Sequence, residues 1–194
     1  MERVKPFYYD CKLRFVVPDS EDCDLLLKWR NSDRVRMNML NDQLISRDEH
    51  LSWLNYILQS SKNKVWIFEY KCVPMGQFNI KEINNKNRTA RLGFYIGEEN
   101  APTGLGSAML YLGFERIFER ENIRKLCSDI LSTNKISLHI NKKFGFQEEG
   151  CLKQQIFRNG EYIDLVLMAL FQSDWLANKD RLRDLIFEKE LSID

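Results

Sequence analysis

The stretch GFYIGEENAPTGLGSAMLYLGF, residues 93–114, changes character twice and decides the fold. An alternating apolar run, typical of a strand, ends in an acidic turn that contains a proline. Gly104 and Gly106 then open a segment whose apolar residues recur at helical spacing. The stretch therefore predicts a strand, a glycine turn and the start of a helix, in that order.

Glycines between a strand and a helix let the backbone approach a ligand closely, because they carry no Cβ atom. The first N–H groups of the helix have no intrahelical partner, and together with the helix dipole they form a cradle for a pyrophosphate. Gly-x-Gly alone is a weak signal, and a tight turn without a ligand is the alternative. The chain has neither G-x-G-x-x-G nor G-x-x-x-x-G-K followed by Ser or Thr, so any phosphate loop here is of another type.

The composition predicts a single domain. A chain of 194 residues with 44% hydrophobic residues can bury one sizeable core, and no repeat or low-complexity linker divides it. We expect one domain over residues 1–194, with its core at about 12–175 and a helix at the C-terminal end. The net charge of +1 argues against a general polyanion-binding surface but leaves room for a local basic patch.

The cysteines and histidines form no metal or disulfide pattern. The five cysteines are odd in number and contain no C-x-x-C, which argues against a disulfide framework and a zinc ribbon. His50 and His139 are far apart and lack the H-E-x-x-H pattern, so we expect no metal. No run is long enough to span a bilayer and none has the form of a leader, so we expect a cytoplasmic protein that binds neither membrane nor nucleic acid.

The first half of the chain predicts a strand, two helices and a meander. We expect a strand at 12–17, a helix over 20–31 with acidic residues in its first turn, and a helix that begins at the capping box formed by Ser46 and Glu49. From residue 65 onward, aromatic and β-branched runs are separated by turns, the first near Val73, and this pattern predicts an antiparallel meander.

The second half predicts a β-α-β crossover. After the glycine turn we expect a helix, a strand at KLCSDIL, a helix from about Asn134, two more strands, and a terminal helix that opens at Ser173 or Asp174. A meander that leads into a crossover is a mixed α/β order, and we expect a ligand at the crossover. The residues that we expect to be buried by periodicity are Trp53, Tyr56, Trp66 and Phe68, together with the row Ile136, Ile140 and Phe144.

The order of these landmarks resembles a known family. The strand GFYIGEE, Gly-x-Gly, an apolar helix, KLCSDIL, N-x-x-S and FGFQEEG follow the order of the acetyl-CoA-binding core of the GCN5-related N-acetyltransferases, the GNAT superfamily. The end of the chain, EEGCLKQQIFRNGEYIDLVLMALFQSDW, resembles the branch that contains the ribosomal-protein alanine acetyltransferases. The run KWRNSDRVRMNMLNDQLISRDEHLSWL, with FYIGEENA and GLG, is similar to the N-acetyltransferases of pseudaminic acid biosynthesis.

The resemblance, which runs from about Leu13 to Trp175, implies a fold and an activity. It implies the acyl-CoA N-acyltransferase fold, a mixed, mostly antiparallel sheet flanked by helices, with acetyl-CoA as cosubstrate and no metal. The implied reaction is direct transfer of acetyl to the 4-amino group of a UDP-linked 4-amino-4,6-dideoxy sugar. Two alternatives stay open: an acetyltransferase of protein N-termini or polyamines, and a non-catalytic module that senses acetyl-CoA. Relatives also suggest a homodimer.

The resemblance assigns residues to the cofactor. It places the pyrophosphate on the loop at 103–107, held by backbone donors, and the pantetheine arm along the strand at 93–97. An asparagine that contacts the cofactor in relatives matches Asn134, for which a helix N-cap is the structural alternative. The residues assigned to the cofactor are Phe94, Tyr95, Ile96, Thr103, Gly104, Leu105, Gly106, Ser107, Asn134, Ser137 and Asn141.

The chain departs from the superfamily pattern at two positions. Ala101 stands where the pattern has Gln or Arg, so backbone donors are expected to carry more of the pyrophosphate binding. Asn141 stands where many relatives have a tyrosine that is proposed to protonate the thiolate; an amide is no acid but can hydrogen-bond the sulfur. The oxyanion donor is expected to be a backbone N–H near Tyr95 and Ile96. The candidate catalytic residues are Asn79, Tyr95 and Asn141.

The resemblance also assigns residues to the acceptor. Judged by residue type alone, Arg30 is a surface charge or an ion-pair partner, and His50 is a partly buried structural histidine. In the related sugar acetyltransferases both positions face the nucleotide-sugar, where an arginine suits a uracil carbonyl or diphosphate and a histidine suits a phosphate or hydroxyl. The residues assigned to the acceptor are Arg30, Asn31, His50, Asn79 and Lys81.

Overall fold

The protein is described by a computed structural model that covers residues 7–18 and 20–187. Its strands are β1 Cys11–Phe15, β2 Lys64–Tyr70, β3 Val73–Asn84, β4 Thr89–Ile96, β5 Lys125–Leu131, β6 Gln147–Arg158 and β7 Glu161–Phe171. Its helices are η1 Tyr8–Asp10, a 3-10 turn, then α1 Glu21–Asn31, α2 Asp33–Arg36, α3 Arg47–Gln59, α4 Leu105–Arg120, α5 Lys135–Lys143 and α6 Gln172–Phe187.

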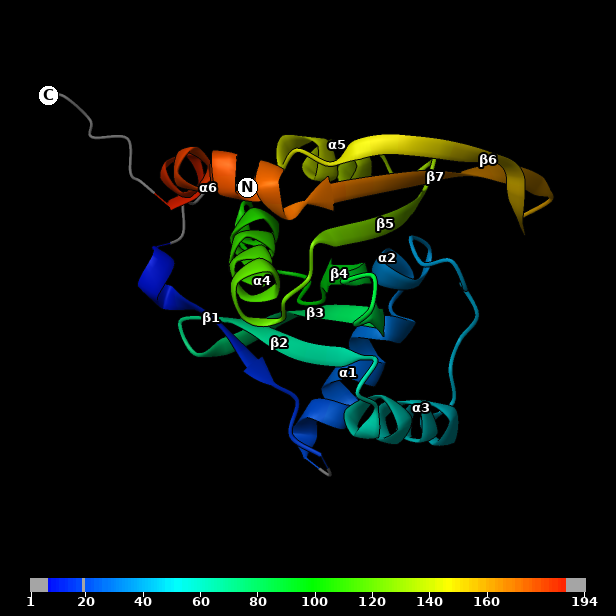
Figure 1. Cartoon of the computed structure of the whole chain (residues 1–194). Coiled ribbons are helices and arrows are strands. Elements are labelled where there is room, and N and C mark those ends of the chain that lie inside the picture. The colour runs from blue at the N-terminus through cyan, green and yellow to red at the C-terminus, as the bar shows by residue number, and fades with distance from the viewer. Residues whose placement is uncertain (1–6, 19, 188–194) are drawn as a thin grey trace, which may run out of the picture.

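The seven strands form one mixed sheet in the order β1-β2-β3-β4-β5-β7-β6 (Figure 1). Among the described strand pairs, β4 with β5 is parallel and the others are antiparallel. This arrangement confirms the expected fold class. The parallel pair is the crossover that α4 makes, as the sequence predicts.

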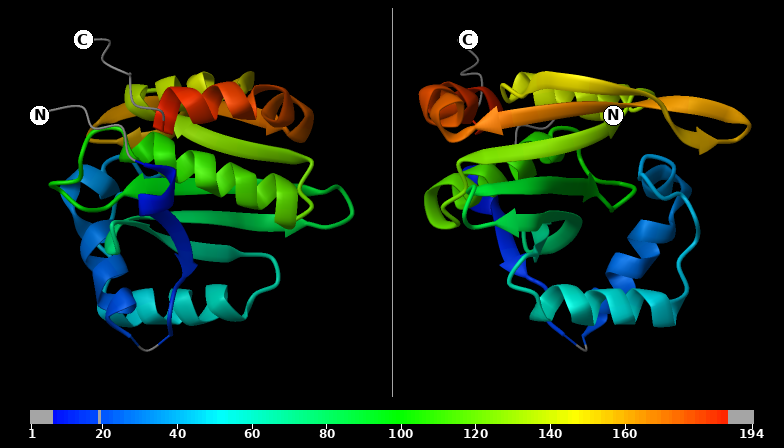
Figure 2. Two further views of the ribbon diagram at one scale, coloured as in Figure 1. Left: turned by 90° about the vertical axis from the view of Figure 1, so that its left-hand side faces the viewer. Right: turned by 45° about the vertical axis from the view of Figure 1, so that its right-hand side comes forward.

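Helices cover both faces of the sheet, and β2 shows why (Figure 2). Side chains of a strand alternate between the two faces, and β2 is apolar at nearly every position. Trp66 and Phe68 face the larger core, which contains the apolar faces of α4 and α6. Val65 and Ile67 face a second core beneath α1 and α3. The two cores lie on opposite faces of the sheet. The helices α1 and α3 therefore cover one face, and α4 covers the other.

Side-chain caps begin α1 and α3, and the cap of α3 is the one that the sequence predicts. The hydroxyl of Ser20 accepts a hydrogen bond from the N–H of Asp22 at 3.2 Å. At α3, the Ser46 hydroxyl accepts from the Glu49 N–H while the Glu49 carboxylate accepts from the Ser46 N–H, a complete capping box. These caps fix where each helix starts and hence which side chains reach the sheet.

Several boundaries differ from the sequence prediction. The first strand is Cys11–Phe15 rather than 12–17. The turn after β2 lies at Lys71 and Cys72, whose φ angles are +51° and +62°, and Val73 already belongs to β3. The terminal helix begins at Gln172. Two successive left-handed residues close a tight hairpin, and nothing in the side chains of Lys71 and Cys72 signals that conformation.

Three residues expected in the core are exposed. Trp53 is 40% and Tyr56 65% exposed, because the buried face of α3 runs through His50 and Leu54 instead. Ile136 is 83% exposed in the first turn of α5. The expectations for Trp66, Phe68 and Phe144 hold, since all three are buried.

The sheet separates between β4 and β5. Their pairing consists of Thr89 with Lys125, Ala90 with Leu126 and Arg91 with Cys127. Beyond this point β4 continues to Ile96 and β5 to Leu131, without further pairing between them. The gap lies in the middle of the sheet, next to the N-terminus of α4.

The described part of the chain has neither a membrane-spanning helix nor a cluster of metal-binding side chains. No helix within residues 7–18 and 20–187 is long and apolar enough to cross a membrane. In the same ranges, no group of three or more His, Cys, Asp or Glu side chains is arranged to hold a metal ion.

Candidate active site

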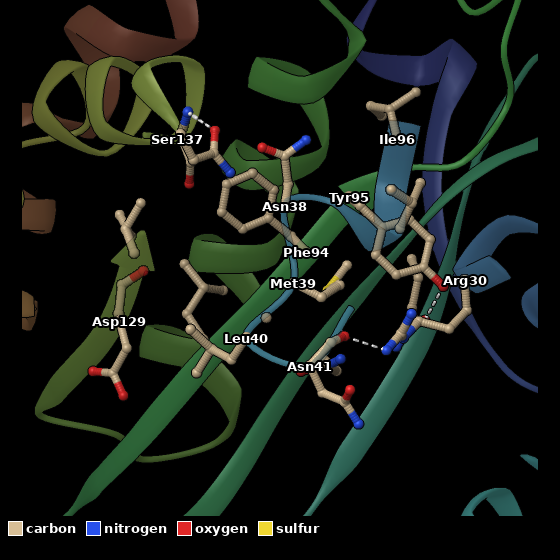
Figure 3. A pocket seen from close by; sticks show the side chains of 18 of the residues that line it. Arg30, Asn38, Met39, Leu40, Asn41, Phe94, Tyr95, Ile96, Asp129 and Ser137 are labelled. Atoms are coloured by element: carbon tan, nitrogen blue, oxygen red, sulfur yellow. Dashed lines mark hydrogen bonds between the residues drawn. The ribbon is translucent and has the colours of Figure 1, made fainter. Parts of the chain in front are cut away.

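A cavity of about 710 Å³ opens where β4 and β5 separate (Figure 3). Small-molecule sites commonly measure roughly 300–1,000 Å³, so this cavity has the size of a ligand site. The lining comes from α1, α2 and the segment after it, α3, β3, β4, β5, the first turn of α4, and α5 with its N-cap. The residues assigned from the sequence that line it are Arg30, His50, Asn79, Lys81, Phe94, Tyr95, Ile96, Gly106, Asn134 and Ser137.

The backbone of β4 points into the gap. Gly97 N–H donates to the Met75 carbonyl at 2.8 Å. This bond flanks the pair formed by Gly76 and Ile96, so Ile96 directs its own N–H and C=O away from β3. Alternation along the strand directs the groups of Phe94 the same way. An extended ligand with amide groups can therefore pair with β4 as an added strand would.

Gly106 lines the cavity at the N-terminus of α4, two residues after Gly104. Gly104 is the N-cap and has φ +108°, a conformation that favours glycine. A Cβ on Gly106 would meet Ile140 Cδ1 at 3.7 Å and Ile96 Cγ1 at 3.8 Å, which are ordinary contacts. The space beside Gly106 is thus open, and the first N–H groups of α4 lie next to it. This geometry fits a diphosphate held by the main chain.

The other residues assigned to this loop lie differently. Thr103 is exposed and Leu105 is a core residue, 1% exposed, so at Leu105 only the backbone can serve a ligand. The Ser107 hydroxyl accepts a hydrogen bond from Lys143 Nζ at 3.1 Å. Lys143 therefore brings a cation to the loop in which Ala101 replaces the usual polar side chain.

Lys143 was not singled out from the sequence, although a signal exists. Ile136, Ile140 and Lys143 follow one another along α5 at spacings of four and then three residues, so their side chains lie on one face of the helix. Ile136 and Ile140 both line the cavity. A lysine that continues an apolar row toward a phosphate loop is a candidate phosphate ligand.

Asn134 and Asn141 are engaged within α5. Asn134 Oδ1 accepts from the Ser137 N–H at 3.0 Å, so the N-cap alternative is realised, and Asn134 also lines the cavity. Asn141 is 0% exposed and lies outside the lining residues. Its amide donates to the Ser137 carbonyl at 2.8 Å, and its Oδ1 has no partner within the described structure. A side chain this short stays within its own helix, where a tyrosine would extend further.

The side chain of Tyr95 lines the cavity. Its hydroxyl donates to Gln77 Oε1 at 2.5 Å. Burial raises the pKa of Tyr95 above its ordinary value, and the nearby Arg30 acts in the opposite direction. The phenol is thus protonated at neutral pH and already has an acceptor for its proton.

Arg30 presents a donor without a partner. Its Nη2 donates to the Asn41 carbonyl at 2.6 Å, as Figure 3 shows, whereas its Nη1 is buried and has no partner within the described structure. Burial lowers the pKa of Arg30, although a guanidinium stays charged at neutral pH. A buried guanidinium N–H that faces a cavity favours an acceptor group on a ligand.

His50 is a second such group. Its side chain is 3% exposed and lines the cavity, and its Nε2 has no partner in the described part of the chain. Burial lowers the pKa of the imidazole, while a hydrogen bond to the backbone of Cys23 opposes that shift. The ring lies 5.6 Å from that of Trp53. In the neutral imidazole the other ring nitrogen donates to the Cys23 backbone, so the free Nε2 is an acceptor and is suited to bind a ligand hydroxyl.

Asn31 and Asn79 have different surroundings. Asn31 lies outside the lining, and its amide makes two hydrogen bonds with the backbone of Ile45, at 2.8 and 3.0 Å. Asn79 packs on Gly93, where an added Cβ would lie 2.4 Å from Asn79 Oδ1. Asn31 therefore holds the chain after α2, whereas Asn79 and Lys81 line the cavity.

The charge of the lining is predominantly positive. Arg30, Arg34, Lys81 and Arg91 line the cavity, and among the described lining residues Asp129 is the sole carboxylate. Arg91 forms an ion pair with Asp129 and another with Glu82 at 2.8 Å. Four cations and one anion leave an excess of three positive charges, with His50 neutral. Arg34, Arg91, Asp129 and residues 38–41 were not singled out from the sequence.

A split sheet, a glycine cradle and unpartnered polar groups together define a binding site for an extended, phosphate-bearing ligand beside a second small molecule. Residues 15–167 match the family model described as "Acetyltransferase (GNAT) domain". The chain belongs to this family. The superfamily indicated by the sequence motifs is therefore confirmed.

Named relatives and a solved structure agree with this family. Spermidine N(1)-acetyltransferase from Escherichia coli (strain K12) is 32% identical over 102 residues, which are 53% of this chain and 55% of the relative. Ribosomal protein uS5-alanine N-acetyltransferase from the same strain is 29% identical over 88 residues, 45% of each chain. The chain thus spans about half the length of these curated relatives. A crystal structure of Vibrio cholerae spermidine N-acetyltransferase in complex with CoA and spermine superposes with a TM-score of 0.80 at 22% identity, over 87% of this chain and 99% of that one.

Proposed function

We propose that this protein transfers an acetyl group from acetyl-CoA to the primary amine of a small molecule. The observation that carries this proposal is the composition of one cavity. It combines the free backbone edge of β4, the open cradle at Gly106, and two buried polar groups without partners, on Arg30 and His50. The first two suit the cofactor and the last two suit an acceptor. Family membership supports the same reaction class.

The chemistry requires a neutral amine, a site for the oxyanion and a route for one proton. The amine nitrogen forms a bond to the thioester carbonyl carbon, the C–S bond breaks, and CoA leaves as the thiolate. The Ile96 N–H, which points into the gap, is placed to donate to the oxyanion. The amine proton leaves through water, and water protonates the thiolate, because the Tyr95 hydroxyl is bonded to Gln77 and Asn141 is buried.

The charge of the lining favours an acceptor that carries negative charge. A nucleotide-linked amino sugar, such as a UDP-linked 4-amino-4,6-dideoxy sugar, offers a diphosphate to Arg30 and hydroxyls to His50. A weakly basic sugar amine also needs no strong general base to be neutral. The excess of cations in the lining thus supports the anionic acceptor on physical grounds.

A polyamine is the second candidate, and the comparisons support it better than they support a sugar. Both the E. coli relative and the V. cholerae structure are spermidine acetyltransferases by name. Against this stands the lining, because a polycation gains from carboxylates and is repelled by arginines and lysines. Asp129, which already pairs with Arg91, is the carboxylate available to it among the described lining residues.

An acceptor assay separates these candidates. Purified protein and acetyl-CoA are incubated with a UDP-4-amino sugar, spermidine or an Ala-starting peptide while thiol release is followed. We expect the fastest release with the sugar, and we expect UDP to compete with it. Turnover with spermidine alone would reverse the choice of acceptor, and turnover with the peptide alone would point to a protein substrate. Tight acetyl-CoA binding without release for any amine would favour a sensing module.

Substitution of Arg30 sharpens the assay. The variant Arg30→Met removes the cation and keeps most of the side-chain volume. We expect it to raise the KM for an anionic acceptor and to leave that for acetyl-CoA unchanged. If spermidine is the acceptor, the same variant should lower its KM, because one repulsive charge is lost. The two candidates thus predict opposite signs for one measurement.

A further inference from the structure

The wall of the cavity opposite β4 is a segment without helix or strand. Residues 37–45 connect α2 to α3, and from this segment Asn38, Met39, Leu40, Asn41 and Ile45 line the cavity. Figure 3 shows Asn38, Met39, Leu40 and Asn41 on the same wall, facing Phe94 and Tyr95. Irregular backbone has few internal hydrogen bonds, so its shape depends on other parts of the protein.

Three side chains hold the second half of this segment. The Asn31 amide pairs with the backbone of Ile45, Arg36 Nη1 donates to the Asp42 carbonyl at 2.9 Å, and Arg30 Nη2 donates to the Asn41 carbonyl at 2.6 Å. All three come from α1 and α2. In the first half, residues 37–40, the N–H groups of residues 37–39 donate to carbonyls of α2, and the carbonyls of this half need donors from elsewhere.

Arg158 holds the first half. Its Nη1 donates to the Met37 carbonyl at 2.7 Å and its Nη2 to the Met39 carbonyl at 2.6 Å. A longer contact of 3.4 Å reaches the Leu40 carbonyl, and Arg158 Nε pairs with the Asp42 carboxylate at 3.0 Å. The side chain of Arg158 is 5% exposed. One guanidinium thus binds three carbonyls and one carboxylate from a segment almost 120 positions earlier in the chain.

The geometry of a hairpin places Arg158 there. It is the last residue of β6 and pairs with Glu161, the first residue of β7. Asn159 and Gly160 between them have φ angles of +50° and +84°, as in the two-residue turns that Asn-Gly favours. Figure 1 shows the tip of this hairpin next to the chain that follows α2. The turn fixes the direction of the strand end, and so fixes where the guanidinium points.

We propose that Arg158 is a positioning residue that holds residues 37–40 as the acceptor wall of the cavity. The effect that we expect on the KM for the acceptor rests on the proposed function. Arg158 is not among the lining residues and acts through the side chains of Asn38, Met39 and Leu40. The hairpin tip thereby sets the width of the acceptor half, while the cofactor half, built on β4 and α4, is independent of it.

The test compares Arg158→Met with the intact protein. We expect amide hydrogen exchange in residues 37–45 to become faster and exchange in α4 to stay unchanged, because only the segment loses its anchor. We expect the KM for the acceptor to rise about tenfold, which corresponds to about 1.4 kcal/mol, with the KM for acetyl-CoA unchanged. If Arg158 had a purely structural role, the variant would change both KM values, or it would lower stability without a selective rise in the KM for the acceptor.

Further variants keep the test decisive. Arg158→Lys retains the charge but not the fork geometry, so it should restore little of the acceptor KM. Asp42→Asn removes the ion pair and keeps the carbonyl contacts, and it should have a smaller effect if Arg158→Met does not fold. Glu161→Gln, at the exposed neighbouring position, is the matched control and should behave as the intact protein does.

The outcomes are distinct. Unchanged exchange in 37–45 would overturn the anchoring by Arg158, and faster exchange with an unchanged acceptor KM would overturn its effect on the acceptor. If the intact protein acetylates no amine at all, the proposed function fails, and the exchange measurement then decides the role of Arg158 on its own.

Discussion

Gly104 and Gly106 are two positions apart, yet the structure gives them different reasons to be glycine. Gly104 needs its left-handed φ of +108°. Gly106 has no left-handed φ and open space around it, so a methyl group there costs the empty protein nothing. We predict that Gly106→Ala binds acetyl-CoA more weakly, with a higher KM, because the methyl group occupies the place of the diphosphate.

The melting temperature of Gly106→Ala distinguishes weaker binding of acetyl-CoA from misfolding of the variant. Alanine is favoured over glycine within a helix by about 1 kcal/mol, so the melting temperature of Gly106→Ala should stay constant or rise. The contrasting variant is Gly113→Ala, whose Cβ would lie 2.2 Å from Phe78 Cζ. That variant should lose stability first. An unchanged KM in Gly106→Ala would show that no phosphate group approaches this glycine.

His50 provides a pH-dependent prediction. Burial lowers the pKa of its imidazole, so the unfolded chain takes up this proton at a higher pH than the folded protein does. The stability that His50 contributes is therefore fully present above the unfolded pKa of about 6.5 and is lost as the pH falls below it. Thermal unfolding of the intact protein and of His50→Gln, followed from about pH 7.5 to about pH 5, should show a weaker pH dependence in the variant. Parallel curves would contradict a neutral, buried imidazole.

The sequence could identify some site residues but not others. Arg30 and His50 stood out because they lie in motifs that resemble a known family. Arg158 could not be found in this way, because its role depends on backbone carbonyls that are about 120 positions away, and carbonyls have no signature in a sequence. Asn141 shows the converse, since a motif position placed it at the cofactor and the structure places it outside the lining.

At the scale of elements, α5 supports the cofactor loop from the side. We predict that Lys143→Met raises the KM for acetyl-CoA several-fold, because Lys143 Nζ lies at Ser107 and a charge-assisted hydrogen bond contributes about 1.5–3 kcal/mol at most. The effect should weaken as salt is added. The adjacent Lys142 is exposed and provides the control variant Lys142→Met. Equal effects of the two substitutions would indicate general charge attraction rather than a contact.

The positions of the elements, the antiparallel meander and the crossover were largely predictable, and the point at which strand pairing ends was not. The capping box at Ser46 and the apolar period of α4 depend on residues close in sequence, which explains why these helices were expected correctly. The point at which β4 and β5 separate depends on contacts between strands that are over thirty residues apart. Nothing in the run from Arg91 to Ile96 distinguishes the paired end from the unpaired one.

At the scale of the whole molecule, one aromatic residue of α4 joins β3, α6 and the turn between α5 and β6 in the larger core. The ring of Phe114 contacts those of Phe78, Phe144, Phe146 and Trp175, among others. We predict that Phe114→Ala lowers the free energy of unfolding by about 3–5 kcal/mol, the usual cost of such a cavity. Urea unfolding measures this. The exposed Tyr56 gives the control, since Tyr56→Ala should change stability by about 0.5 kcal/mol or less.

The early end of the β4–β5 pairing also has a mechanical consequence. Three residue pairs are a narrow bridge between two half-sheets, one built on β1–β4 and the other on β5–β7. Apart from this bridge, the larger core beneath α4 joins the half-sheets, so we expect any relative rocking to be greatest at the open end of the gap. A cofactor arm bound along Phe94 and Ile96 would act as a brace across the gap and stiffen the molecule far from the reacting atoms. The two half-sheets would then move together as one rigid body when the cofactor is bound.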